Sequence, residues 1–278
     1  MPGLGPIWKM DKIFIDFYNQ QLQNWSLAQK NVSELNRIKR KPFKTGIFSG
    51  FVQFNPARAV STLANVEKEA IKERKCFLCS QNRPQEQESL EILPGWELLV
   101  NPFPILPYPF TIAQKQHTPQ VLDLETGKKL AELLPGMVVF YNADGAGASA
   151  PDHCHYQAVR IEDLPLLRHL EEWPDGLSQG FPFKFIRNGE EEILNEIPVN
   201  AYFWNSDKGI QTLIIPRMAH RPSHFYKEGK DRRAVSPGAI EMAGIIVTPI
   251  EDDYERITDS EIEEIYQEVA YKNEKRSK

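Results

Sequence analysis

The segment His153-Cys154-His155-Tyr156-Gln157 closely follows the glycine-rich run Asp144-Gly145-Ala146-Gly147-Ala148-Ser149. Side chains alternate along a β-strand, so a strand through this segment would place both histidines and the glutamine on one face. Cys154 and Tyr156 would face the other way. Imidazole is well suited near neutral pH to act as a nucleophile, a proton carrier or a metal ligand. Two histidines beside an amide-rich loop therefore indicate a catalytic site, with a pair of purely structural histidines as the alternative.

The composition is that of an ordinary globular protein. The chain has 278 residues, 41% of them hydrophobic, which is enough for one large or two small domains with a sizeable core and no disulfides. A net charge of -5 gives no electrostatic reason to expect a nucleic-acid or membrane partner. The start Met1–Pro6 lacks a signal-peptide pattern, and no apolar run approaches the ~20 residues that span a bilayer. Three cysteines cannot all pair, so the simplest interpretation is a reduced, cytoplasmic protein.

Hydrophobic periodicity predicts the elements around this segment. Helices are expected over the first 40 residues, at 61–74, 121–134 and 163–173, and from about Asp259, with Thr258 or Asp259 as the N-cap. Strands are expected at 46–54, 96–100, 110–113, 137–141, 183–186, 199–204, 211–215 and 244–248. A basic turn is expected at 37–42. Four prolines in Asn101–Pro109 exclude a helix there and predict a rigid loop, and the charged tail 272–278 is expected to fray.

Cys76 and Cys79 are spaced like half of a structural zinc site. Zinc takes four ligands, and His117 and His153 would complete a Cys2His2 tetrahedron that fixes the catalytic strand to the preceding sheet. The alternative is that the two cysteines are simply small, partly buried residues.

If His153 is a ligand, His155 is left as the nucleophile. A neutral imidazole can attack an α-phosphorus and hold the nucleotidyl group as a phosphoramidate, which divides one displacement into two easier ones. Its second ring nitrogen needs an acceptor, often a backbone carbonyl, to fix the tautomer. Gln157 can donate a hydrogen bond to a phosphoryl oxygen but cannot supply a proton, which favours transfer over hydrolysis.

Several other residues are candidates for nucleotide or phosphate binding. The glycine loop offers backbone N–H groups and a hydroxyl. Two arginines in the turn after 211–215 could form bidentate hydrogen bonds to phosphate oxygens, assisted by His220 or His224. The alternative is a solvated turn with surface arginines. Glu241, in an otherwise apolar stretch, suggests a buried partner or a substrate hydroxyl. The candidate binding residues are Asn142, Gly145, Gly147, Ser149, Arg58, Arg217 and Arg221.

The order Gly147, Ser149, His153, His155, Gln157 resembles the Gly-x-Ser, His-x-His-x-Gln motif of one histidine-triad branch. That branch contains galactose-1-phosphate uridylyltransferase, diadenosine tetraphosphate phosphorylase and GDP-galactose phosphorylase. The segment Val52–Arg58 is similar to an early strand near the family's nucleotide site, and Ser236–Gly244 is similar to a segment of the GDP-galactose phosphorylases. Two departures exist: Asp152 lengthens the spacer after Ser149, and Cys154 replaces a proline.

The resemblance implies an α+β fold in which two antiparallel-sheet halves form an internal pseudo-dimer with flanking helices. We expect an N-terminal helical segment at 1–44, a catalytic half at 45–175 and a second half without the motif at 176–278. The resemblance also implies zinc on Cys76, Cys79, His117 and His153, with the nucleotidyl group on His155.

The preferred function is therefore a nucleotidyltransferase or phosphorylase. Its substrate would be a nucleotide sugar or a dinucleotide, and its acceptor phosphate or a sugar phosphate. A histidine-triad-type nucleotide hydrolase and a zinc-stabilised nucleotide-binding module without catalysis are the alternatives, and a homodimer is left open.

Overall fold

The computed structural model describes residues 10–63, 68–172, 180–188 and 197–272. Its strands are β1 (Lys39–Thr45), β2 (Phe48–Phe54), β3 (Leu90–Leu93), β4 (Trp96–Val100), β5 (Phe110–Gln114), β6 (Met137–Asn142), β7 (His155–Arg160), β8 (Ile186–Arg187), β9 (Val199–Ser206), β10 (Gly209–Pro216) and β11 (Ile245–Thr248). Its α-helices are α1 (Lys12–Asn24), α2 (Ser26–Glu34), α3 (Ala59–Thr62), α4 (Lys68–Glu73), α5 (Leu124–Leu133), α6 (Pro165–Glu172), α7 (Ser223–Tyr226), α8 (Ala239–Met242), α9 (Glu251–Arg256) and α10 (Asp259–Val269).

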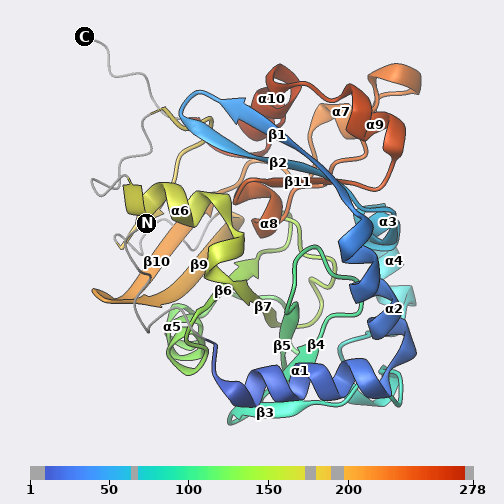
Figure 1. Ribbon diagram of the computed structural model, residues 1–278, viewed down its shortest axis with the longest axis vertical. Coiled ribbons are helices and arrows are strands. Elements are labelled where there is room, and N and C mark those ends of the chain that lie inside the picture. The colour runs from blue at the N-terminus through green and yellow to red at the C-terminus, as the bar shows by residue number, and fades with distance from the viewer. Residues whose placement is uncertain (1–9, 64–67, 173–179, 189–196, 273–278) are drawn as a thin grey trace.

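An eight-stranded sheet with the order β3-β4-β5-β7-β6-β9-β10-β8 forms the centre of the molecule (Figure 1). Every pairing in it is antiparallel. Strands β3–β7 come from the first half of the chain and β8–β10 from the second, and the halves meet where β6 pairs with β9. The expected α+β class is confirmed. The boundary expected at 175/176 lies outside the described residues, and the division into domains stays a prediction.

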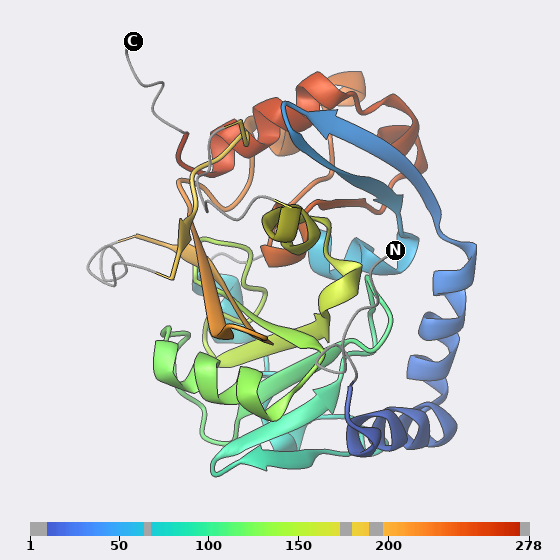
Figure 2. The ribbon, with the colours of Figure 1, turned by 60° about the vertical axis from the view of Figure 1, so that its left-hand side comes forward.

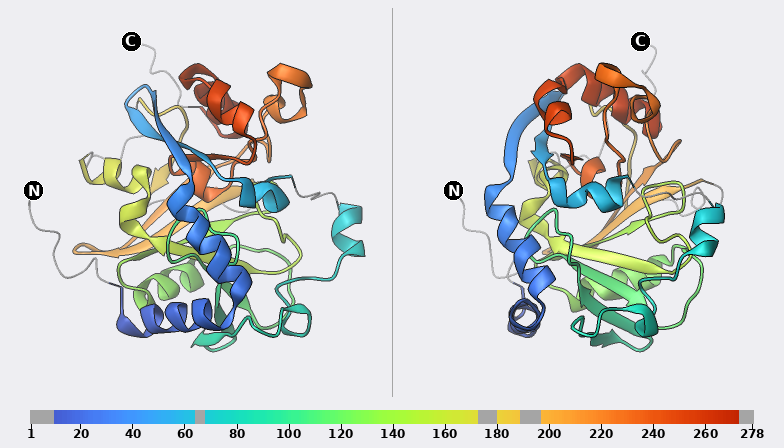
Figure 3. Two further views of the ribbon diagram at one scale, coloured as in Figure 1. Left: turned by 45° about the vertical axis from the view of Figure 1, so that its right-hand side comes forward. Right: turned by 90° about the vertical axis from the view of Figure 1, so that its right-hand side faces the viewer.

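The large sheet is covered on both faces. One face packs against α1 and α5, through residues such as Phe14 and Leu130. The other packs against α6, α8 and α10 and against a smaller sheet of order β1-β2-β11 (Figures 2 and 3). The histidine motif of residues 153–157 therefore lies between two layers that the two ends of the chain help to build. No helix in the described ranges combines the length and apolar character that crossing a bilayer requires.

Most of the expected elements form, and three expectations were wrong in detail. The basic stretch 37–42 is not a turn but largely belongs to β1, an edge strand paired with β2. An edge strand tolerates Pro42 and exposed lysines, which also block further pairing. The helix expected at 61–74 is replaced by the short helices α3 and α4, and the strand expected at 183–186 is reduced to β8. At α10, Thr258 is the N-cap and forms a capping box with Glu261.

Candidate active site

The proline-rich loop beside the catalytic strand is held by side chains from β2 and the turn after it. The carbonyl oxygens of residues 103–105 accept hydrogen bonds from Arg58 (2.8 Å), Asn55 (3.0 Å) and Gln53 (3.1 Å). A loop with few N–H groups still has carbonyl groups that need partners when buried. The Gln-Phe-Asn-Pro-Ala-Arg segment therefore shapes one wall of the site.

Strand β7 begins at His155, so the expectation that His153 shares a strand face with His155 and Gln157 was wrong, whereas the alternation from His155 to Gln157 is as expected. Cys154 and Tyr156 pack in the core beneath the sheet, on the side of α1 and α5. His155 and Gln157 face the opposite side, where they line a cavity. His153 lies just before β7 and faces a cysteine cluster instead. The two histidines thus serve two different sites.

The ring of His155 is buried and is oriented by the backbone of His153. Its Nδ1 lies 2.8 Å from the carbonyl oxygen of His153, which acts as the acceptor of the ring N–H. Burial lowers the pKa of His155 to about 4, so the ring is neutral near pH 7. The remaining nitrogen, Nε2, forms no hydrogen bond with the described residues and carries the lone pair that a nucleophile needs.

Gln120 holds the backbone of His155 on both sides. Its Oε1 accepts a hydrogen bond from the N–H of His155 at 2.8 Å, and its Nε2 donates to the carbonyl of His155 at 2.9 Å. The same Nε2 lies 2.9 Å from the carbonyl oxygen of Asn142, at the end of β6. Nothing in the sequence around Gln120 indicated this positioning role, because its partners lie 22 and 35 residues away.

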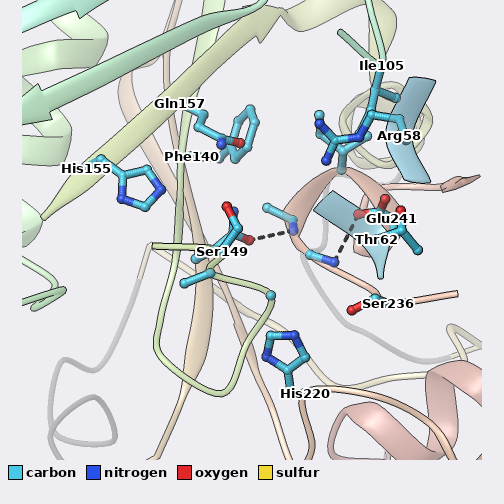
Figure 4. Close-up of a pocket in the computed structure, with 16 residues that line it drawn as sticks. Arg58, Thr62, Ile105, Phe140, Ser149, His155, Gln157, His220, Ser236 and Glu241 are labelled. Atoms are coloured by element: carbon cyan, nitrogen blue, oxygen red, sulfur yellow. Dashed lines mark hydrogen bonds between the residues drawn. The ribbon is translucent and has the colours of Figure 1, made fainter. Parts of the chain in front are cut away.

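A cavity with about 590 Å³ of empty space, partly open to solvent, lies in front of His155 (Figure 4). It brings together six of the expected residues: His155, Gln157, Asn142, Gly147, Ser149 and Arg58. Gly145, Arg217 and Arg221 do not line it. Further lining comes from Thr62, Ile105, Phe140, His220, Ser236 and Glu241. Of these, His220 and Glu241 were individual candidates for ligand binding in the sequence analysis.

The glycine loop is docked on the start of α8. Gly147 has φ +95°, and a Cβ there would lie 2.4 Å from the Cα of Gly238, so only glycine fits. Asn142 Oδ1 accepts hydrogen bonds from the N–H of Ala239 (2.7 Å) and from Asn200 Nδ2 (2.8 Å). In the structure Asn142 therefore joins the two halves of the chain at the edge of the cavity.

Glu241, which is buried, and Arg58, which is partly buried, are oppositely charged groups on the cavity wall. Burial lowers the pKa of Arg58 and raises the pKa of Glu241, while the charge of each opposes the shift of the other. Glu241 also accepts a hydrogen bond from the N–H of Gly238 at 2.9 Å. This part of the cavity is therefore close to electrically balanced.

The two candidate arginines of the second half lie behind the cavity. Arg217 is only 1% exposed. Its guanidinium donates hydrogen bonds to the carbonyl oxygens of Val269 (2.8 Å) and Pro237 (2.9 Å) and to Asn200 Oδ1 (2.6 Å). Arg221 donates to Ser236 Oγ at 3.0 Å. In this arrangement Arg217 joins the C-terminal helix to the loop of the second half, rather than pointing toward a ligand.

Cys76, Cys79, His117 and His153 gather as the spacing of the cysteines suggested. Their ligand atoms all lie within 4.8 Å of one another. The Nδ1 atom of His153 lies 3.2 Å from Cys76 Sγ, and the Nδ1 atom of His117 lies 3.2 Å from Cys79 Sγ. Two thiols and two imidazoles around one point are a donor set that can hold a tetrahedral metal ion.

The outward nitrogens of both histidines face oxygen atoms. His153 Nε2 lies 2.6 Å from the carbonyl oxygen of Gln114, and His117 Nε2 lies 3.9 Å from Asp152, whose carboxylate also binds Arg74 at 2.6 Å. Oxygen partners of this kind orient histidines whose other nitrogen binds a metal. Asp152, the extra residue before the motif, thus lies next to the cluster.

Two family profiles match the chain. Residues 17–160, more than half of it, match "Domain of unknown function (DUF4922)", and residues 193–277 match "GDPGP1-like, C-terminal domain". No curated protein matches the sequence significantly.

Solved structures of the yeast Ap4A phosphorylase Apa2 are similar in fold. The complex with AMP superposes with a TM-score of 0.58 at 16% identity, covering 94% of this chain and 98% of that one. The complex with Ap4A gives a TM-score of 0.58 at 14% identity, covering 93% and 98%. The fold is thus the histidine-triad-like fold of the branch to which the motif pointed.

Proposed function

The chain belongs to the DUF4922 family, and from that premise we propose that it is a nucleotidyltransferase or phosphorylase with a covalent nucleotidyl-His155 intermediate. The proposed substrate is a nucleotide sugar or a dinucleotide polyphosphate. The second is in keeping with AMP and Ap4A, the ligands named for the yeast structures. The proposed acceptor is phosphate or a sugar phosphate.

The observation that carries this proposal is the state of the His155 ring. Its Nδ1–H is bound to the carbonyl of His153, so the lone pair is on Nε2, the nitrogen that faces the cavity (Figure 4). In the first step Nε2 would form a bond to the α-phosphorus while the bond from that phosphorus to the leaving oxygen breaks. The leaving phosphate takes the electron pair. In the second step an acceptor oxygen displaces Nε2 and restores the neutral ring.

Donors around the ring would stabilise the charge that develops on the phosphoryl oxygens. Gln157 offers an amide, and Gly147 and Ser149 bring backbone N–H groups and a hydroxyl to the same cavity. Leaving groups that are themselves phosphates depart without a proton, so a glutamine is sufficient where a third histidine would serve hydrolysis. This is the reason to prefer transfer.

Zinc is the metal that the Cys76, Cys79, His117 and His153 set fits best, and we propose it as a structural ion. When bound, it would link the loop after α4 to the residues just before β7. Thiolate ligands need a reducing environment, and all three cysteines are free, which supports a cytoplasmic setting.

Product analysis with Ap4A, GDP-hexose and UDP-hexose, each with and without inorganic phosphate, tests the proposal. A phosphorylase acting on Ap4A would yield ADP and ATP only when phosphate is present. AMP and ATP formed at the same rate without phosphate would instead establish the hydrolase. Tight binding without any turnover of these substrates would support the binding module.

A further inference from the structure

One wall of the cavity is built from hydrogen-bond donors that the proposed chemistry on His155 does not use. His220 comes from the turn after β10, Ser236 from the loop before α8, and Thr62 from the end of α3. Figure 4 places His220 and Ser236 on the side of the cavity away from Gln157. The three residues lie far apart in the sequence, and the fold brings them around one space.

Arg221 links Ser236 and Thr62 through hydrogen bonds, although it does not line the cavity itself. Its Nε donates to Ser236 Oγ at 3.0 Å, and its Nη2 donates to the carbonyl oxygen of Thr62 at 3.1 Å. The guanidinium also lies over the ring of Phe225, 4.1 Å from the ring centroid. Because Ser236 Oγ is an acceptor from a cation, its own hydrogen remains to be donated into the cavity.

The imidazole of His220 lies in a positive environment. It makes no side-chain hydrogen bond within the described part of the chain, and burial together with the charges of Arg221 and Arg217 lowers its pKa to about 4. The ring is therefore neutral at pH 7, with one N–H to donate. Two adjacent guanidinium groups make this end of the cavity attractive to an anion.

The acidic group of the cavity, Glu241, offsets part of this positive field. Glu241 accepts a hydrogen bond from the N–H of Gly238, and the charges of both Arg58 and Arg217 act on it. In Figure 4 it lies between Arg58 and Ser236, next to Thr62. The donors His220 and Ser236, backed by Arg221, thus lie on a different part of the wall from Arg58.

We propose that His220, Ser236 and Thr62, backed by Arg221, bind the anionic acceptor, either inorganic phosphate or a phosphate monoester. The chemical step rests on the proposed function: an unprotonated acceptor oxygen forms the bond to the phosphorus held on His155, the P–N bond breaks, and its electron pair returns to Nε2. No proton has to move. The role of the donors is to hold the dianion against the charge of the nucleotidyl group.

The test compares His220→Asn and Ser236→Ala with His224→Asn. His224 lies in the same loop region, but its Nε2 faces Glu264 at 3.6 Å instead of the cavity, so its variant reports a general disturbance of the loop. In the first arm, isothermal calorimetry measures the binding of inorganic phosphate and, separately, of glucose 1-phosphate to each folded variant. Losing one hydrogen bond to a charged group should weaken binding about 10- to 100-fold in the first two variants and leave His224→Asn unchanged.

In the second arm, each variant is loaded with a nucleotidyl group, and its release is timed after addition of either acceptor. Release should slow by the same about 10- to 100-fold in the first two variants. Loading should slow as well, because the acceptor enters opposite Nε2, at the position from which the leaving phosphate departed, and His224→Asn should change neither rate. The acceptor that shows these losses is the one the site takes. Equal binding by all variants, or an equal loss in His224→Asn, would overturn the acceptor site. If the wild-type protein binds phosphate, His220→Asn weakens that binding, and no nucleotidyl group is ever attached to His155, the proposed function is refuted while the anion site is supported.

Discussion

His155 Nδ1 lies 2.8 Å from the carbonyl oxygen of His153, so the backbone of a metal-cluster residue fixes the tautomer of the candidate nucleophile. The two residues face different sites, yet a single hydrogen bond links them. Any change that shifts the loop before β7 should therefore reach the chemistry through this contact, and several predictions depend on it.

Replacing Gln120 with leucine should slow the transfer of the nucleotidyl group to His155 about 10- to 100-fold. The backbone of His155 then loses hydrogen bonds on both sides, and its imidazole is no longer held in the orientation needed for attack on phosphorus. Rapid-quench measurement of adduct formation checks this. Gln267→Leu, on α10, is the matched control. An unchanged loading rate in a folded Gln120→Leu protein would contradict the positioning role.

Replacing Cys76 with serine should abolish stoichiometric zinc and lower the thermal midpoint, because a tetrahedral site rarely survives the loss of a thiolate. Metal analysis by mass spectrometry checks the content. Cys154→Ser, buried outside the cluster, should keep its zinc. Full zinc occupancy in Cys76→Ser would refute the ligand set.

Asp152→Asn should weaken zinc binding by about 10- to 100-fold, because His117 loses the carboxylate that faces its outward nitrogen. Competition with a chelator measures the affinity. Asp144→Asn, an exposed residue of the glycine loop, serves as the control. The same affinity in both variants would show that Asp152 does not orient His117.

Gly147→Ala should lower the free energy of unfolding by about 1–3 kcal/mol more than Gly95→Ala does. Both glycines have positive φ, but a Cβ at Gly95 meets nothing within 4 Å, whereas one at Gly147 meets Gly238 at 2.4 Å. The difference therefore isolates the clash from the backbone strain. Urea unfolding measures it, and equal losses would mean that the loop can move away from α8.

The sequence was sufficient where the signal is local. The alternation in 153–157 predicted which side chains of β7 face the cavity, and the Cys76 and Cys79 spacing predicted half of the cluster. Thr258 was one of the two N-caps expected from the sequence, and the structure confirms it. Each of these signals depends on neighbours along the chain.

The sequence was insufficient where the partners are distant. The residues 37–42 become β1 only because β2 offers an edge, and Gln120 matters only because the fold brings it beside β7. A buried Arg217 and a phosphate-binding arginine look alike in a sequence. Only the carbonyl groups that surround Arg217 in the folded chain distinguish the two.

The most direct test of the central claim is the intact mass of the protein after incubation with a nucleotide substrate in the absence of any acceptor. The wild-type chain should gain the mass of one nucleotidyl group, localised to His155 by peptide mapping and lost again when phosphate is added. His155→Ala should gain none, while keeping its zinc. A nucleotidyl adduct that persists in His155→Ala, or that maps to another residue of the wild type, would contradict the account.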